Sequence, residues 1–166
     1  MELPDANVVL VRHGDIGVKS ARVQSWMEEI LAENLQGTLS ARSIPGTVDQ
    51  QWGRLFVRTE KAAAAARAAG DVFGVVSASP AIAVDPSLNV IAETLAAVAR
   101  GTYDGGSFAV DARRAGNHEF TSQDVGDVGG KAIWEAVAGD YEPIVDLDDP
   151  DHRFQVEVRE GEAYVF

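Results

Sequence analysis

The order of hydrophobic patterns in the first 80 residues is the feature that most constrains the fold of this chain. Apolar alternation or apolar runs predict strands, and a 3.6-residue period predicts helices. In chain order, the patterns are a strand at Val8–Arg12, a helix at Ser20–Leu35 with Gly37 as its stop, strands at Leu39–Ile44 and Arg54–Thr59, a helix at Glu60–Ala69 and a strand at Val72–Ser77. This β-α-β-β-α-β order is that of a ferredoxin-like antiparallel sheet with two helices on one face.

A second unit follows a boundary expected between Pro80 and Pro86, which gives domains at residues 1–80 and 81–166. Its patterns are a helix at Ser87–Arg100, a strand at Ser107–Arg113, a helix capped by Thr121 or Ser122 with Asp124 as capping-box partner, and strands at Phe154–Val158 and Ala163–Phe166. Helices and strands are interleaved in both halves. We therefore expect an α+β protein, with a ferredoxin-like N-terminal domain followed by a second α/β domain. The chain ends within a strand pattern, so we expect it to be the first part of a longer protein.

The charge balance favours a protein that is soluble in molar salt. The 26 acidic residues exceed the 14 basic ones, for a net charge of −12, and only Lys19, Lys61 and Lys131 are lysines. This composition is typical of halophilic proteins, and an acidic mesophilic protein is the alternative. The acidity argues against nonspecific nucleic-acid binding through bulk charge, so any nucleic-acid site must be a local group of arginines. There is no cysteine, no signal peptide and no apolar run long enough to span a membrane, so we expect a cytoplasmic location.

Arg12-His13-Gly14, at the end of the first strand pattern, supports two incompatible functions. In a histidine phosphatase, His13 would attack phosphorus while Arg12 neutralised the phosphate. That chemistry needs a second histidine, and neither His118 nor His152 has a suitable sequence context. In the other interpretation, Arg12 and Lys19 belong to an RNA-binding module.

Two further motifs carry no catalytic or metal assignment. Gly126–Ala132 fails as a phosphate loop, because the first glycine and the Ser/Thr that binds magnesium are missing. The carboxylates of Asp146–Asp151 lack the spacing of an EF-hand, so a solvated turn is favoured over a metal site. We therefore predict no metal ligand and no catalytic residue in this chain.

Arg113 and Arg114 lead from a strand end through a polar loop to the start of a helix. Arginine forks and the free N–H groups of a helix N-terminus both suit backbone phosphates. An exposed strand end, where one arginine of a pair faces solvent, explains the same residues equally well.

The residues together resemble the tRNA 4-thiouridine synthases (tRNA sulfurtransferases). Val11 to Lys19 resembles that family's Arg-Tyr-Gly-Glu-Ile-x-Leu-Lys opening, and Gly53–Val57 and Val72–Pro80 look like its next two strands. Phe108 to Ser122 and the last strands resemble its THUMP domain. The match covers nearly the whole chain, and the acidic composition indicates a haloarchaeal member. His13 stands where the family has tyrosine, and Ser20-Ala21 replaces its Gly-x-Asn.

The resemblance implies a chain that binds tRNA at its acceptor stem and 3′ end, for 4-thiouridine formation at position eight, without being catalytic itself. Catalysis would belong to a PP-loop domain, in cis or in trans, that uses ATP; its Ser-Gly-Gly-x-Asp-Ser motif is not in this sequence, and this chain would need no cofactor. A homodimer partner is also implied. The expected RNA-binding residues are Arg12, Lys19, Arg22, Arg113, Arg114, Asn117, His118, Thr121 and Ser122.

Overall fold

The computed structural model describes residues 3–14, 20–51 and 53–166. Its contacts divide the chain into two compact units, Glu2–Ile82 and Ala83–Phe166. Strand β4 (Val75–Val84) runs across this division, so residues 80–84, which lie at the expected domain boundary, belong to a strand. Among the described helices, none combines the length and the apolar character that a membrane crossing requires.

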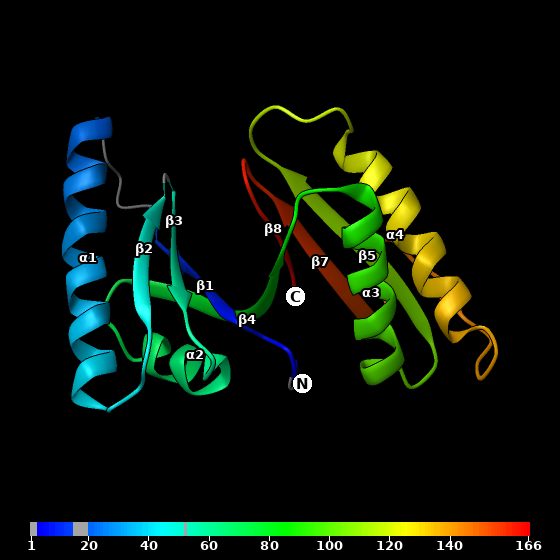
Figure 1. The fold of residues 1–166 in the computed structure, drawn as a ribbon, viewed down its shortest axis with the longest axis horizontal. Helices are drawn as coiled ribbons and strands as arrows, with labels where there is room; N and C mark the ends of the chain where they lie inside the picture. The colour runs from blue at the N-terminus through cyan, green and yellow to red at the C-terminus, as the bar shows by residue number, and fades with distance from the viewer. Residues whose placement is uncertain (1–2, 15–19, 52) are drawn as a thin grey trace. The chain divides into compact units, whose positions relative to one another are not determined.

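The N-terminal unit has the expected ferredoxin-like order. Strands β1 (Val8–His13), β2 (Thr47–Gln51), β3 (Arg54–Arg58) and β4 form an antiparallel sheet in the order β2-β3-β1-β4. Helices α1 (Ala21–Ala41) and α2 (Ala62–Gly70) follow β1 and β3 (Figure 1). The α+β prediction for this half is confirmed, although several element boundaries were wrong, including that of β4, which was expected at Val72–Ser77.

Two of these errors concern helix α1. It continues through Gly37 to Ala41, so Gly37 does not end it and Leu39–Ile44 is not a strand. Leu39 is fully buried, and its burial in the core stabilises the extra helical turn. The second strand begins only at Thr47, after the turn at Pro45-Gly46.

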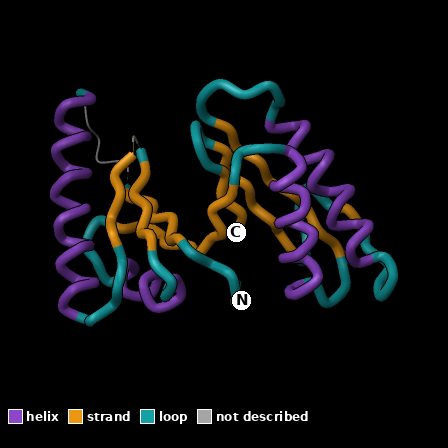
Figure 2. Tube along the Cα trace, viewed as in Figure 1, coloured by secondary structure: helices purple, strands orange, loops and turns teal. Residues whose placement is uncertain are grey.

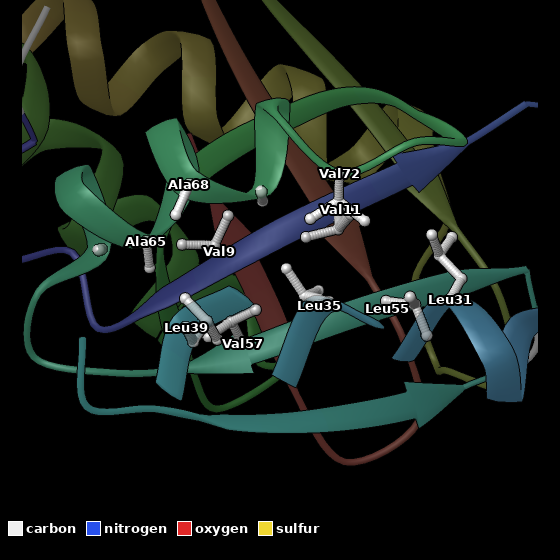
Figure 3. Packing of buried hydrophobic residues seen from close by; sticks show 12 residues of the cluster. Val9, Val11, Leu31, Leu35, Leu39, Leu55, Val57, Ala65, Ala68 and Val72 are labelled. Carbon is white, nitrogen blue, oxygen red and sulfur yellow. The ribbon is translucent and has the colours of Figure 1, made fainter. Parts of the chain in front are cut away.

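The core of this unit lies between the sheet and its two helices. Figure 3 shows side chains from β1, β3, α1 and α2 meeting in one layer. The cluster includes Val9, Val11, Leu31, Leu35, Leu39, Leu55, Val57, Ala65 and Ala68. Val9 and Val11 face the helices, so the alternation of a strand directs Val8, Leu10 and Arg12 to the other face of the sheet.

The C-terminal unit contains a second sheet in the order β8-β7-β5-β6. Its strands are β5 (Ser107–Arg114), β6 (Ile144–Val145), β7 (His152–Val158) and β8 (Ala163–Val165). Strand β5 is parallel to both β6 and β7, whereas β7 and β8 are antiparallel. Strand β6 was not predicted from the sequence.

Helices α3 (Leu88–Thr102) and α4 (Ser122–Val137) pack against each other and against this sheet (Figure 2). Gly129 of α4 permits their close approach, because a Cβ atom there would lie 2.6 Å from Cδ1 of the buried Leu95 on α3. A Cβ atom on Gly130 would meet nothing within 4 Å, so only the first of these adjacent glycines is needed for packing.

Candidate nucleic-acid interface

Arg113 and Arg114 end the parallel strand β5 on the surface of the C-terminal unit. Both residues are exposed, and they lie opposite Glu157 and Val158 of β7. The side chain of Val110, on the same strand, faces α4, because a Cβ atom on Gly129 would lie 3.6 Å from Val110 Cγ1. Since strand residues alternate between faces, Arg114 projects to the helix side and Arg113 to the opposite side.

The loop between β5 and α4 is held against the end of β7. Ala115 N–H donates to the carbonyl of Val158 over 2.8 Å. Arg114 Nη1 donates to the carbonyl of Gly116 over 3.0 Å, so part of this guanidinium is used within the loop. The connection is the teal segment that leads into α4 in Figure 2. The two arginines therefore project from a segment of backbone that these hydrogen bonds hold in place.

His118 fastens the middle of this loop. Its Nε2 lies 3.1 Å from the carbonyl oxygen of Arg159, which can only accept, so Nε2 carries the proton. Its ring lies 5.4 Å from the ring of Phe120. Nδ1 of His118 is a buried acceptor with no partner among the described residues. Asn117, beside it, is exposed.

Helix α4 begins with the capping box that the sequence predicted. Thr121 Oγ1 accepts from Asp124 N–H over 3.1 Å, and the Asp124 carboxylate accepts from Thr121 N–H over 2.8 Å. The backbone and hydroxyl hydrogen bonds from Thr121 lower the pKa of Asp124. Ser122 is the first helical residue and is exposed. One N–H group of this helix N-terminus is thus already bonded to a carboxylate.

The other expected RNA-binding residues belong to the N-terminal unit. Arg12 is half-buried, and its Nη1 donates to the hydroxyls of Ser77 over 3.2 Å and Ser79 over 2.9 Å on β4. Arg22 is exposed in the first turn of α1, which Ser20 caps. Lys19 lies outside the described residues.

The geometry at His13 argues against a nucleophile. Its Nε2 is 2.9 Å from Glu28 Oε1, its Nδ1 is 3.2 Å from the carbonyl oxygen of Gly14, and its side chain is only 9% exposed. Both ring nitrogens are therefore directed at oxygen atoms of the chain itself, and neither is free to attack a phosphate. The comparisons below also give the phosphatase interpretation no support.

Sequence reasoning missed Arg159 as part of this region. Its backbone carbonyl accepts from His118, and its Nε donates to Glu157 over 2.8 Å. Glu157 and Arg159 lie two residues apart, so they share one face at the end of β7. The two-residue spacing of Glu157 and Arg159 was visible in the sequence. Only the fold shows that Arg159 lies beside the loop after β5.

The ferredoxin-like unit and the α/β unit with its arginine-bearing loop define a two-domain chain, and both domains match known families. Residues 8–79 match the ThiI ferredoxin-like domain, and residues 86–166 match the THUMP domain. The chain therefore contains a ThiI ferredoxin-like domain followed by a THUMP domain.

The similarity to relatives extends along nearly the whole chain but not along the relatives. The "Probable tRNA sulfurtransferase" of Halobacterium salinarum is 58% identical over 163 residues, which is 98% of this chain and 42% of that protein. A halophilic source for this relative agrees with the interpretation of the acidic composition. The chain thus spans about two fifths of the length of the relative.

Solved structures give the same fold. PH1313 from Pyrococcus horikoshii superposes with a TM-score of 0.83 at 32% identity, over 96% of this chain and 53% of that one. A 4-thiouridine synthetase crystallised with RNA and ATP gives a TM-score of 0.79 over 97% of this chain and 40% of that one. The latter is 21% identical, so the likeness is one of fold.

Proposed function

We propose that this chain binds tRNA and positions its acceptor stem and 3′ end for 4-thiouridine formation at position eight. The observation that carries the proposal is the exposed pair Arg113 and Arg114, which leaves β5 beside a fixed loop within the THUMP-matched residues. Catalysis is assigned to a PP-loop domain that uses ATP, in cis or in trans, and a second copy of the chain is a further expected partner.

The arginine pair suits this role because the chain as a whole repels RNA. With a net charge of −12, favourable contact with phosphates must be local. At about 1 M salt the Debye length is roughly 3 Å, so only groups in direct contact attract each other. Arginine retains value under these conditions, since its planar fork makes two short hydrogen bonds to one phosphate.

Carboxylates around the loop limit how an RNA backbone approaches. Asp124 already bonds one N–H at the start of α4, and the side chain of Glu160 lies against Gly116, 3.0 Å from where a Cβ atom would be. A phosphate bound here would contact the guanidinium group of Arg114 on the helix side of the sheet, or that of Arg113 on the opposite side, rather than replace the cap. We therefore expect the arginines to contribute more than Thr121 or Ser122.

The decisive experiment replaces both arginines with glutamate and compares the variant with a matched charge control. In the control, Arg100→Glu/Lys131→Glu makes the same net change at two exposed positions of the same unit. Arg100 lies in the last turn of helix α3, which precedes the start of β5, whereas the arginine pair lies where β5 ends. Circular dichroism should show that both variants fold.

We expect Arg113→Glu/Arg114→Glu to weaken binding of all tRNAs, by about 1.5–3 kcal/mol for each arginine that contacts a phosphate. The control should bind nearly as wild type. Backbone contacts set position rather than sequence, so the loss should be uniform across tRNAs. Wild-type protein should also prefer an acceptor-stem minihelix with an intact 3′ overhang over a blunt duplex. Equal affinity for blunt duplex RNA, or equal losses in the two variants, would contradict the proposal.

A further inference from the structure

The free edge of the C-terminal sheet is unusually apolar. Four large side chains within seven residues are exposed: Tyr141 by 39%, Ile144 by 62%, Val145 by 54% and Leu147 by 71%. Ile144 and Val145 form strand β6, the last strand of its sheet, and the other two flank it in the orange segment after α4 in Figure 1. The segment Tyr141–Leu147 is called the β6 edge below. Contiguous exposed apolar surface of this kind commonly marks an interaction site.

The backbone of the β6 edge presents an unused donor and acceptor. The N–H groups of Ile144 and Asp146 donate to the carbonyls of Gly106 and Phe108 on the β5 side, over 3.4 and 3.1 Å. Strand alternation therefore directs the N–H and C=O of Val145 away from β5. Within the described chain these two groups have no strand to pair with, which is the condition for adding a strand to a sheet.

Carboxylates define the charge of what could bind there. Asp140, Glu142, Asp148 and Asp149 are exposed around the β6 edge, and their carboxylates have no ion-pair partner among the described residues. The nearby Arg153 is already paired with Asp111 over 2.6 Å. RNA phosphates would be repelled, and a second copy would bring the same carboxylates against these ones.

We propose that the β6 edge docks an extended segment of a protein partner in which apolar residues alternate with lysine or arginine. The segment would pair with Val145 through its backbone, pack its apolar side chains against Ile144 and Leu147, and set its basic side chains against the surrounding carboxylates. This inference does not depend on tRNA binding, because the β6 edge and the arginine pair use different residues and opposite charge.

The test uses a fluorescent octapeptide of alternating valine and lysine, a valine–glutamate peptide as its charge control, and fluorescence anisotropy in about 1 M KCl. Val145→Pro removes the outward N–H but no hydrogen bond to β5. Val145→Thr is the matched control, since it keeps the N–H and a β-branched side chain. Circular dichroism checks that both variants fold.

We expect the basic peptide to bind wild type and Val145→Thr, to bind Val145→Pro about tenfold more weakly, and to exceed the acidic peptide clearly. Unchanged binding by Val145→Pro would mean nonspecific attraction to an acidic surface and would overturn the proposal. So would no binding by wild type, displacement of the peptide by tRNA, or a dimer in sedimentation that Val145→Pro dissolves. The last two results would assign the edge to RNA or to a second copy.

Discussion

We expect Glu28→Ala to destabilise the N-terminal unit more than a comparable substitution on the exposed surface of α1. Glu28 is only 1% exposed, yet its carboxylate accepts four hydrogen bonds. They come from His13 Nε2 at 2.9 Å, Gly53 N–H at 3.2 Å, Gln24 Nε2 at 3.3 Å and Gln50 Nε2 at 3.4 Å. This carboxylate thus joins α1 to the end of β1, to β2 and to the turn before β3.

The expected cost follows from what the substitution leaves behind. Removing the acceptor leaves the remaining donors desolvated, at about 1–3 kcal/mol for each donor that stays buried. Gln24 and Gln50 are half-exposed and regain some water, so we expect a total cost of about 3 kcal/mol. With a urea dependence of about 1–3 kcal/mol per M, the unfolding midpoint should fall by roughly 1–3 M.

Urea unfolding followed by circular dichroism in constant molar KCl measures this loss. The matched control is Glu29→Ala, which removes the same side chain from the next, exposed position and should change stability by no more than about 0.5 kcal/mol. Glu28→Gln keeps one acceptor oxygen and should fall between the two. If Glu28→Ala were within about 1 kcal/mol of Glu29→Ala, the buried network would not stabilise the fold as argued.

Three further predictions test other parts of the structure. Gly130→Ala should stabilise the chain by about 0.5–1 kcal/mol, while Gly129→Ala should be about 1–3 kcal/mol less stable than it in the same urea assay; equal stabilities would refute the close helix contact. Hydrogen bonds from the backbone N–H and hydroxyl of Ser107 lower the pKa of Asp151. The ionised Asp151 carboxylate therefore stabilises the fold above about pH 4, and this stabilisation is lost as the pH falls through the lowered pKa of Asp151. An NMR titration should show a higher Asp151 pKa in Ser107→Ala. His13 should form no phosphohistidine with phosphoryl donors; a labelled band lost in His13→Ala would revive the phosphatase interpretation.

Local sequence was sufficient to predict a helix or strand where the residues of that element alone determine its structure. The start of α4 is an example, because Thr121 and Asp124 complete the capping box three residues apart. The order of elements in the N-terminal unit was also predictable, since each strand or helix carries its own periodicity. The match to known domains confirms that architecture.

The buried face of α1 could not be read from local sequence. The sequence pattern placed six apolar residues of this helix on one stripe: Val23, Trp26, Met27, Ile30, Leu31 and Leu35. Leu31 and Leu35 are buried as expected, but Val23, Trp26 and Ile30 are 45%, 58% and 39% exposed. The helix turns Glu28 inward together with the two leucines. A carboxylate becomes acceptable there only because distant residues donate to it, and those partners are set by the tertiary fold. Strand β6 was missed for a related reason: two residues have no periodicity, and pairing with β5 alone makes them a strand.

The parallel pairing of β5 with β7 determines when the arginine pair becomes available during synthesis. Arg113 and Arg114 are opposite Glu157 and Val158, which leave the ribosome only after all of α4 and β6. Until then, the loop after β5 lacks the backbone of β7 that holds it in place. A nascent chain that has emerged only as far as α4 should therefore lack the fixed loop through which we propose that the arginine pair binds tRNA. Emergence of β7 would complete the interface.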